Sequence, residues 1–188
     1  MQKIIIGIAG VAQSGKDTLA NFFVEKDGFE RIGFADAMRN VLYATNPIVS
    51  LIYKDRFREI VRVQSVVDAI GWELAKNEYP EIRQLLQQLG TEGGRNCLSE
   101  DIWIRTLFER AKKDRLVIPD VRFENEAKAI HDKGGAIIRV ARNGYSPVND
   151  HISEVAFLGE DILLENNGTP EQLYEKALLE LQIHGFIL

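Results

Sequence analysis

The chain has 188 residues, of which 45% are hydrophobic and 27% are charged, a balance that fits one folded domain with a hydrophobic core. A formal net charge of −5 argues against a nucleic-acid polymer as partner, because such binders normally present a basic face. No apolar stretch approaches the roughly 18 residues of a membrane helix, and no signal peptide precedes the first apolar run. We therefore expect a cytoplasmic protein. Cys97 is the single cysteine, and we interpret it as a small buried hydrophobe.

The first predicted strand, Ile4–Ala9, leads into a glycine-rich loop and then into a helix that carries Leu19 and Phe23 on its inner face. The loop has the spacing Gly-x4-Gly-Lys of a P-loop, in which backbone N–H groups and the helix N-terminus hold phosphate. Lys16 adds a full positive charge between the outer phosphates. The alternative, a chance glycine turn, does not account for strand, lysine and helix together. The predicted phosphate-binding residues are Gly10, Ala12, Gln13, Ser14, Gly15, Lys16, Asp17 and Thr18.

Asp17 departs from the P-loop pattern, because Ser or Thr normally follows the lysine and binds Mg²⁺. Asp17 is therefore a candidate to hold the ion through water, and Thr18 is a candidate to reach an inner phosphate. A second strand is predicted over residues 28–35, with Asp36 and Arg39 just beyond it. Ligands of open α/β sheets bind at the carboxyl ends of strands, so both residues are expected near the phosphate site. Asp36 is equally explained as the N-cap of the next helix.

Residues 51–78 are predicted to be helical, with an inner stripe that includes Ile60 and Leu74 and with breaks at Asn46-Pro47 and Gly71. A clearer helix begins at Pro80, and residues 90–95 are predicted to form a glycine-rich loop. Another helix follows Ser99, with Trp103 in the core.

The third predicted strand, residues 116–119, ends at Asp120, as in a Walker B motif that holds Mg²⁺. Arg122 follows, and then a helix over 124–132. The fourth strand, 136–141, precedes Arg142 and a turn-rich stretch where we expect a closing lid. His151 lacks a second histidine at metal-ligand spacing, which argues against a zinc site.

A fifth strand over 162–165 and a last helix capped by Thr169 and Gln172 complete the predicted order. Strands alternate with helices, which predicts an α/β fold in three layers: a five-stranded parallel sheet, the P-loop strand central, with helices on both faces. The predicted division is a single domain 1–188. Its core is about 1–50 and 114–188, its helical acceptor-binding region about 51–113, and its lid about 142–154.

Five sequence motifs together point to a known family. They are Gly15-Lys16-Asp17-Thr18, Phe34-Ala35-Asp36-Ala37-Met38-Arg39, Leu86-Gln87-Gln88-Leu89-Gly90-Thr91-Glu92 with Arg95, Asp120-Val121-Arg122-Phe123 with Asn125-Glu126, and His151-Ile152-Ser153-Glu154. With these motifs the chain resembles the phage-type deoxynucleoside monophosphate kinases of the P-loop nucleotide-kinase superfamily. The resemblance covers nearly the whole chain, and one departure is Glu124, where the family pattern has Pro.

The resemblance implies ATP as phosphate donor, a deoxynucleoside 5′-monophosphate as acceptor, and Mg²⁺. If the chain is phage-encoded, the host cytoplasm is its expected location.

Phosphoryl transfer between two phosphates requires two anions held in line, with their charge neutralised and water excluded. Lys16, Arg122 and Arg142 are the expected catalytic cations, Arg142 from the lid. Asp17 and Asp120 are the metal candidates, and by likeness to other nucleotide kinases Asn167 and Gly168 are expected near the donor adenine. The expected acceptor-binding residues are Asp36, Arg39, Gln88, Glu92, Arg95 and Arg122.

Two alternatives stay open at this stage. Dephospho-coenzyme A kinases share the P-loop and an Asp after the second strand, but their acceptor is a hydroxyl that needs a general base such as Asp36. A nucleotide-binding switch is the other alternative, although the Asn-Lys-x-Asp motif of GTPases is absent from the sequence. The sequence also leaves open whether the chain forms a homodimer.

Overall fold

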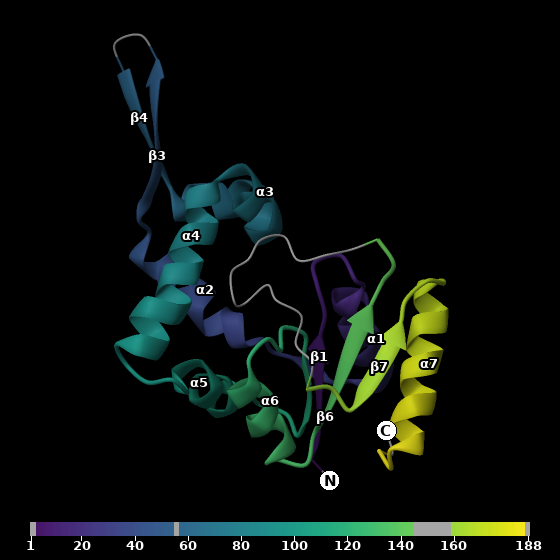
Figure 1. Cartoon of the computed structure of the whole chain (residues 1–188). Helices are drawn as coiled ribbons and strands as arrows, with labels where there is room; N and C mark the ends of the chain where they lie inside the picture. Colours follow the sequence, from purple (N-terminus) through teal and green to yellow (C-terminus); the bar gives the residue numbers. More distant parts are fainter. Residues whose placement is uncertain (1–2, 55–56, 145–158, 187–188) are drawn as a thin grey trace. The chain divides into compact units, whose positions relative to one another are not determined.

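Figure 1 shows the computed structural model of the chain, which describes residues 3–54, 57–144 and 159–186. The chain forms two compact units, residues 1–34 with 106–188 and residues 35–105. Each unit is described by itself. No helix among the described residues is both long enough and apolar enough to cross a membrane. The predicted lid begins at Arg142, but most of it, from residue 145 on, lies outside the described residues.

The first unit is built on a five-stranded sheet in the order β2-β5-β1-β6-β7, in which every pair of neighbours is parallel. β1 is the middle strand, so the predicted parallel sheet with a central P-loop strand is confirmed. In the register, Ile6 lies opposite Val117 of β5 on one side and Ala136 of β6 on the other. The strands are β1 (Ile4–Ala9), β2 (Glu30–Arg31), β5 (Arg115–Ile118), β6 (Ala136–Ala141) and β7 (Ile162–Glu165).

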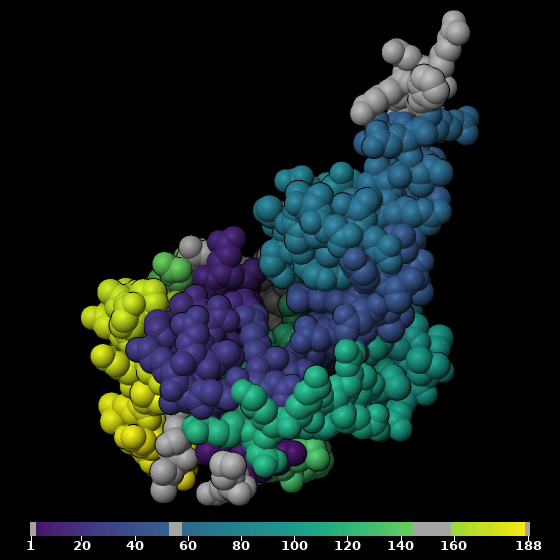
Figure 2. All heavy atoms as spheres, turned by 180° about the vertical axis from the view of Figure 1, so that it is seen from behind, coloured from purple at the N-terminus to yellow at the C-terminus, as the bar shows by residue number. Residues whose placement is uncertain are grey.

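Helices cover both faces of this sheet, as predicted. α1 (Lys16–Asp27) and α7 (Pro170–Ile183) lie side by side on one face (Figure 2), where Phe23 and Tyr174 contact edge to face. α6 (Glu124–His131) covers the other face, and its Ile130 lies against Gly7 and Gly135. The described residues of the sheet therefore form the middle layer of three.

The second predicted strand is shorter than expected, and this is a correction. β2 contains only Glu30–Arg31, and α2 (Phe34–Thr45) begins where the strand was predicted to end. The reason is a cap from far along the chain: the Asp120 carboxylate accepts a hydrogen bond from the Phe34 N–H (2.9 Å), which satisfies one of the first donors of α2. Asp36 is consequently the third residue of α2 and not its N-cap.

The second unit contains most of α2, a two-stranded antiparallel hairpin and a run of helices. The prediction of helix is wrong for residues 51–54 and 57–62, because these residues belong to the two strands of the hairpin. Val49 and Val61 are buried in the core of this unit, whereas Ile60 and Leu74 of the predicted inner stripe are each 53% exposed. The predicted break at Gly71 is confirmed, since its φ of 74° interrupts α3. Its elements are β3 (Ile48–Lys54), β4 (Phe57–Arg62), α3 (Val63–Glu78), α4 (Pro80–Gln88) and η1 (Leu89–Asn96), and the unit ends at Arg105 within α5 (Ile102–Arg110).

The glycine-rich stretch after α4 is also not the predicted loop. Residues Leu89–Asn96 form η1, a π-helix that continues from α4. Gly94 packs on the Trp103 ring so closely that a Cβ there would lie 2.5 Å from a ring carbon, which explains why glycine is needed. Trp103 is 5% exposed and lies in the core, as predicted. Cys97, just after η1, is exposed, so its interpretation as a buried hydrophobe is wrong.

Candidate active site

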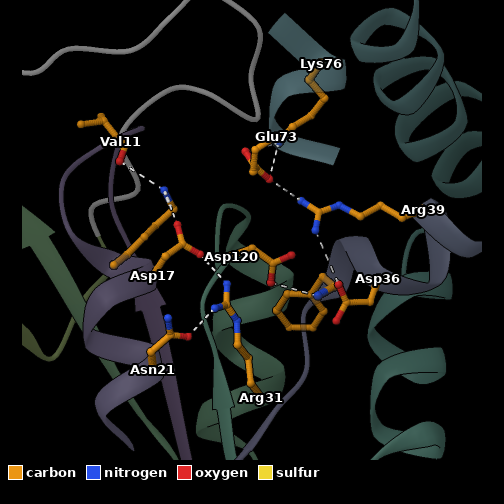
Figure 3. Close-up of polar contacts among 11 residues, drawn as sticks. Val11, Asp17, Asn21, Arg31, Asp36, Arg39, Glu73, Lys76 and Asp120 are labelled. Carbon is orange, nitrogen blue, oxygen red and sulfur yellow. Dashed lines mark hydrogen bonds and ion pairs between the residues drawn. The ribbon is translucent and has the colours of Figure 1, made fainter. Parts of the chain in front are cut away.

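The P-loop of the first unit is a tight turn between β1 and α1. Three of its residues have positive φ, Gly10 (148°), Gln13 (63°) and Gly15 (104°), and the Ser14 N–H donates to Val11 O (3.3 Å). Lys16, the first residue of α1, folds back over the loop, and its ammonium donates to the same Val11 carbonyl (3.3 Å; Figure 3). The positive end of α1 and the lysine charge therefore meet at one loop, which suits an anion.

Asp17 is held by an arginine that the sequence analysis did not single out. Its Oδ1 accepts a hydrogen bond from Arg31 at the end of β2, and Arg31 also donates to Asn21 Oδ1 (2.7 Å; Figure 3). Asp17 Oδ2 lies 3.9 Å from the Lys16 ammonium. No motif predicts Arg31, but its place on the strand next to β5 brings it to the first turn of α1.

Asp120 lies where the Walker B interpretation expects it, directly beyond the carboxyl end of β5. Because β5 and β1 are parallel neighbours, Asp120 and the P-loop are at the same edge of the sheet. Gly33 passes so close that a Cβ on it would lie 2.8 Å from Asp120 Oδ2. The carboxylate is thus placed by β5 on one side and by the start of α2 on the other.

Arg122 follows in the turn before α6, and a buried carboxylate shapes that turn. Glu126 is 2% exposed, and its Oε2 accepts hydrogen bonds from the N–H of Arg122 (2.8 Å) and of Phe123 (3.1 Å). Glu126 was noted only as part of the family motif, and its contact with the backbone of Arg122 was not foreseen. The sequence did contain a signal for this contact: Glu126 is the third residue of a helix, a position from which a glutamate side chain accepts from the N-cap N–H in a capping box.

The ends of β6 and β7 bring three more predicted residues to the same edge of the sheet. Arg142 follows β6 and is exposed. Asn167 Oδ1 accepts from the Asn143 N–H (3.3 Å), and Gly168 lies against Gln172. Asn166, which was not predicted, donates its side-chain amide to Ser14 O of the P-loop (2.8 Å).

In the second unit, Asp36 and Arg39 belong to a chain of charged groups. Arg39 lies 3.9 Å from Asp36, one turn before it on α2, and 3.3 Å from Glu73 on α3 (Figure 3). Lys76 contacts the same Glu73 carboxylate at 2.8 Å. Burial lowers the pKa of the Lys76 ammonium below its ordinary value, against the opposing effect of Glu73. Glu73 and Lys76 were missed because a solvated helix face explains them equally well from sequence.

Three further predicted acceptor residues, Gln88, Glu92 and Arg95, lie on α4 and η1. Arg95 donates to Gly90 O (3.0 Å), the same carbonyl that accepts from the Trp103 indole (2.9 Å). Gln88 and Glu92 are both exposed. Asp36 and Arg39 thus belong to one network of charged groups, and Arg95 is anchored to the backbone of η1.

Two viral proteins are similar to this chain in sequence. A protein of Acanthamoeba polyphaga mimivirus, named as a candidate deoxynucleotide monophosphate kinase, is 27% identical over 199 residues, which cover 93% of this chain and 94% of that protein. The deoxynucleotide monophosphate kinase of Enterobacteria phage T4 is 28% identical over 111 residues, covering 54% of this chain and 46% of the phage protein.

Among solved structures, shikimate kinase from Aquifex aeolicus vf5 superposes with a TM-score of 0.48 at 12% identity, over 96% of this chain and 97% of that chain. A likeness of this size says nothing about the substrate. The profile of the deoxynucleotide monophosphate kinase family matches residues 46–177, well over half of the chain. Its match includes the network of Glu73 and Lys76, η1 and the Asp120–Glu126 segment. The chain belongs to the deoxynucleotide monophosphate kinase family.

Proposed function

We propose that the chain transfers the γ-phosphoryl group of ATP to the phosphate of a deoxynucleoside 5′-monophosphate, releasing ADP and the deoxynucleoside diphosphate. The binding of ATP as donor is supported by the P-loop, where the Lys16 ammonium and the N-terminus of α1 lie at the same loop. The family supplies the acceptor class. Transfer between two phosphates needs no general base, so catalysis rests on alignment and on charge.

In the donor half, ATP binds to the P-loop with its phosphates on backbone N–H groups. Lys16 leaves the Val11 carbonyl, with which it makes a hydrogen bond of 3.3 Å, and moves to the outer phosphates. The exchange is favourable because a full anionic charge replaces a neutral carbonyl as the acceptor. Asn167 and Gly168, at the end of β7, are the proposed neighbours of the adenine.

Mg²⁺ is proposed as the metal, and the donor set at the sheet edge fits it. Asp17 and Asp120 offer carboxylate oxygens, the ligands Mg²⁺ prefers. In nucleotide sites this ion takes one or two carboxylates and completes its shell with phosphate and water. When bound, Mg²⁺ would neutralise phosphate charge. Both carboxylates already accept a hydrogen bond, Asp17 from Arg31 and Asp120 from the Phe34 N–H, so both remain candidates for the metal.

For the acceptor, we propose that the Glu73 carboxylate occupies the position that the phosphate of the bound deoxynucleoside monophosphate takes. Its carboxylate accepts from two cations, Arg39 and Lys76, at 3.3 and 2.8 Å. Glu73 is 77% exposed and can swing away, whereas the side chains of Arg39 and Lys76 are only 30% and 20% exposed and keep their positions. A phosphate carries more charge than a carboxylate and matches the guanidinium fork, so it displaces Glu73.

The remaining cations are assigned to the transferring group. Arg122, placed by Glu126, and Arg142, just after β6, are proposed to stabilise the charge that spreads over the phosphoryl oxygens. Arg95, Gln88 and Glu92 are proposed to contact the acceptor nucleoside or its phosphate from α4 and η1. Asp36 is proposed to orient Arg39 rather than to act as a base, since it lies 3.9 Å from that guanidinium.

An acceptor screen tests the proposal. ADP release is measured with each of the common deoxynucleoside monophosphates, with the matching ribonucleotides and with dephospho-coenzyme A. We expect release that depends on one or more deoxynucleoside monophosphates, in a one-to-one ratio with the diphosphate formed. Release driven only by dephospho-coenzyme A would identify the competing kinase, and slow hydrolysis that no acceptor accelerates would identify a switch.

A homodimer is tested on the same preparation by sedimentation velocity. Its proposed contact surface is the β3–β4 hairpin, where Ile48, Leu51 and Ile60 are 48%, 46% and 53% exposed. A two-stranded hairpin is only marginally stable by itself, so burial of these side chains would stabilise it. A monomer at all concentrations would exclude the dimer.

A further inference from the structure

We propose that Asn166 is a positioning residue for phosphate binding, which acts by fixing the orientation of the Ser14–Gly15 peptide in the P-loop. The inference rests on the proposed ATP site and names a residue outside it. Asn166 lies 152 positions along the chain from Ser14, and its side-chain Nδ2 donates to Ser14 O at 2.8 Å. This hydrogen bond links the turn after β7 to the P-loop.

The turn that carries Asn166 is itself anchored to the sheet. The Asn166 backbone N–H donates to Ala141 O (2.8 Å), the last residue of β6, directly after the β6–β7 pairing ends. The side chain therefore projects from a fixed point of the sheet edge. A hydrogen bond from a rigid element transmits position, whereas one from a mobile loop would not.

The hydrogen bond to the Ser14 carbonyl also fixes the orientation of the Gly15 N–H, because the two groups belong to one trans peptide. In a trans peptide the C=O and the following N–H point in opposite directions within one plane. When Asn166 holds the Ser14 carbonyl, the Gly15 N–H is therefore held pointing away from Asn166. Backbone N–H groups that point into a P-loop are its phosphate ligands, so Asn166 sets the direction of one of them.

Gly15 shows how close the contact is. A Cβ on Gly15 would lie 2.3 Å from Asn166 Nδ2, and its φ of 104° is in the left-handed region that disfavours other residues. Ser14 is fully buried, so water cannot readily replace a lost donor at its carbonyl. Both facts indicate that the carboxamide and the glycine fit each other.

The chemistry requires an amide at this position. The Asn166 NH₂ donates to a carbonyl, which a carboxylate of the same size cannot do. An aspartate would instead place negative charge against the Ser14 oxygen and next to the proposed phosphates. Asn166→Asp is thus an isosteric variant that keeps the volume and removes the function, and Asn166→Ala removes the contact altogether.

The experiment measures binding of inorganic tripolyphosphate, ATP and a deoxynucleoside monophosphate by calorimetry, with thermal unfolding in parallel. Gln172→Ala is the matched control. It removes the side chain that accepts from the Thr169 N–H (3.0 Å) at the same turn, without a contact to the P-loop among the described residues. Lys16→Ala reports on the phosphate site itself.

For Asn166→Ala and Asn166→Asp we expect at least ~10-fold weaker binding of both tripolyphosphate and ATP, or about 1.4 kcal/mol, with the larger loss for Asp. Affinity for the monophosphate should stay within about twofold of the wild type. Gln172→Ala should lower the melting temperature and leave tripolyphosphate binding unchanged.

The inference is overturned if Asn166→Asp binds tripolyphosphate like the wild type, or if Gln172→Ala loses as much affinity as the Asn166 variants. Suppose that the Asn166 variants give this negative result. If Lys16→Ala loses tripolyphosphate binding, the proposed ATP site stands and only the role of Asn166 is wrong. If Lys16→Ala also binds tripolyphosphate like the wild type, the proposed ATP site is wrong as well.

Discussion

Glu126 offers the sharpest link between a buried interaction and the proposed chemistry. Its carboxylate is 2% exposed and accepts from two backbone donors, the N–H groups of Arg122 (2.8 Å) and Phe123 (3.1 Å). A hydrogen bond to a charged group contributes about 1.5–3 kcal/mol, and a buried donor left without a partner costs about 1–3 kcal/mol. Glu126→Gln keeps an acceptor oxygen of the same size, so its free energy of unfolding should fall by only about 1–2 kcal/mol. Glu126→Ala removes the shared acceptor of both N–H groups and should lose about 3–5 kcal/mol.

The same substitutions should alter turnover through Arg122. Misplacement of a catalytic group by about 1 Å can cost ~10²-fold, so we expect kcat for Glu126→Ala to fall at least ~10-fold and that for Glu126→Gln to fall less. Steady-state kinetics at saturating ATP, with urea unfolding of each variant, separates the two effects. Glu124→Gln is the control, an exposed acid in the same first turn of α6. If Glu126→Ala remains folded and turns over as fast as Glu124→Gln, Glu126 does not position Arg122 for catalysis.

Three further predictions concern the donor site and the core of the first unit. Lys16→Ala should retain less than about a tenth of wild-type turnover with an unchanged melting temperature, because a charged group that binds phosphate typically contributes ~10²-fold or more to the rate. Higher turnover would contradict the assignment of Lys16 to the ATP phosphates. Asp120→Asn should raise the Mg²⁺ concentration needed for half-maximal activity more than it weakens ATP binding, and a shift seen instead with Asp17→Asn would move the metal role to Asp17. Burial, with a hydrogen bond to Asp27, raises the pKa of Tyr174 to about 12, so the stability that its neutral hydroxyl contributes is complete below pH 10 and is lost as the pH approaches 12. In urea unfolding, the stability advantage of the wild type over Tyr174→Phe should therefore shrink from pH 8 to pH 11, and a constant difference would refute the shift.

β1 and β6 were predictable because they are largely buried on both faces. Ile4–Ala9 is apolar throughout and Ala136–Ala141 is apolar except for Arg139, and the structure begins and ends both strands where the sequence predicts. The last helix was equally clear, since Thr169 and Gln172 form the capping box expected of them. Local signals of this kind do not depend on the rest of the fold.

The hairpin and η1 were missed for a physical reason that they share. In residues 48–62, β-branched and charged residues alternate loosely, so a helical stripe and a strand pattern fit about equally well until Val49 and Val61 are known to be buried. In η1, glycines normally indicate a loop, but Gly94 is required here by the Trp103 ring. Contacts between distant segments decide both cases, and neither segment carries a local signal for them.

In the candidate site too, residues within a short motif were predictable and residues that depend on distant partners were not. The P-loop and Asp120 are recognisable because their chemistry lies in one short motif each. Arg31, Glu73 and Asn166 act through partners 14, 34 and 152 residues away, which no spacing rule reveals. The cap that Asp120 provides to Phe34, across 86 residues, is a further example.

The most direct test of the account is a paired binding experiment on Lys16→Ala and Arg39→Ala. The account assigns ATP to the P-loop and the monophosphate to the network of Arg39, Glu73 and Lys76. Calorimetry measures how tightly each variant binds ATP and the preferred deoxynucleoside monophosphate. We expect Arg39→Ala to weaken the monophosphate by about 30-fold or more, the loss of a desolvated phosphate clamp, while ATP stays within about threefold. Lys16→Ala should show the opposite pattern, and ATP binding that falls with Arg39→Ala while the monophosphate is unaffected would contradict the central claim.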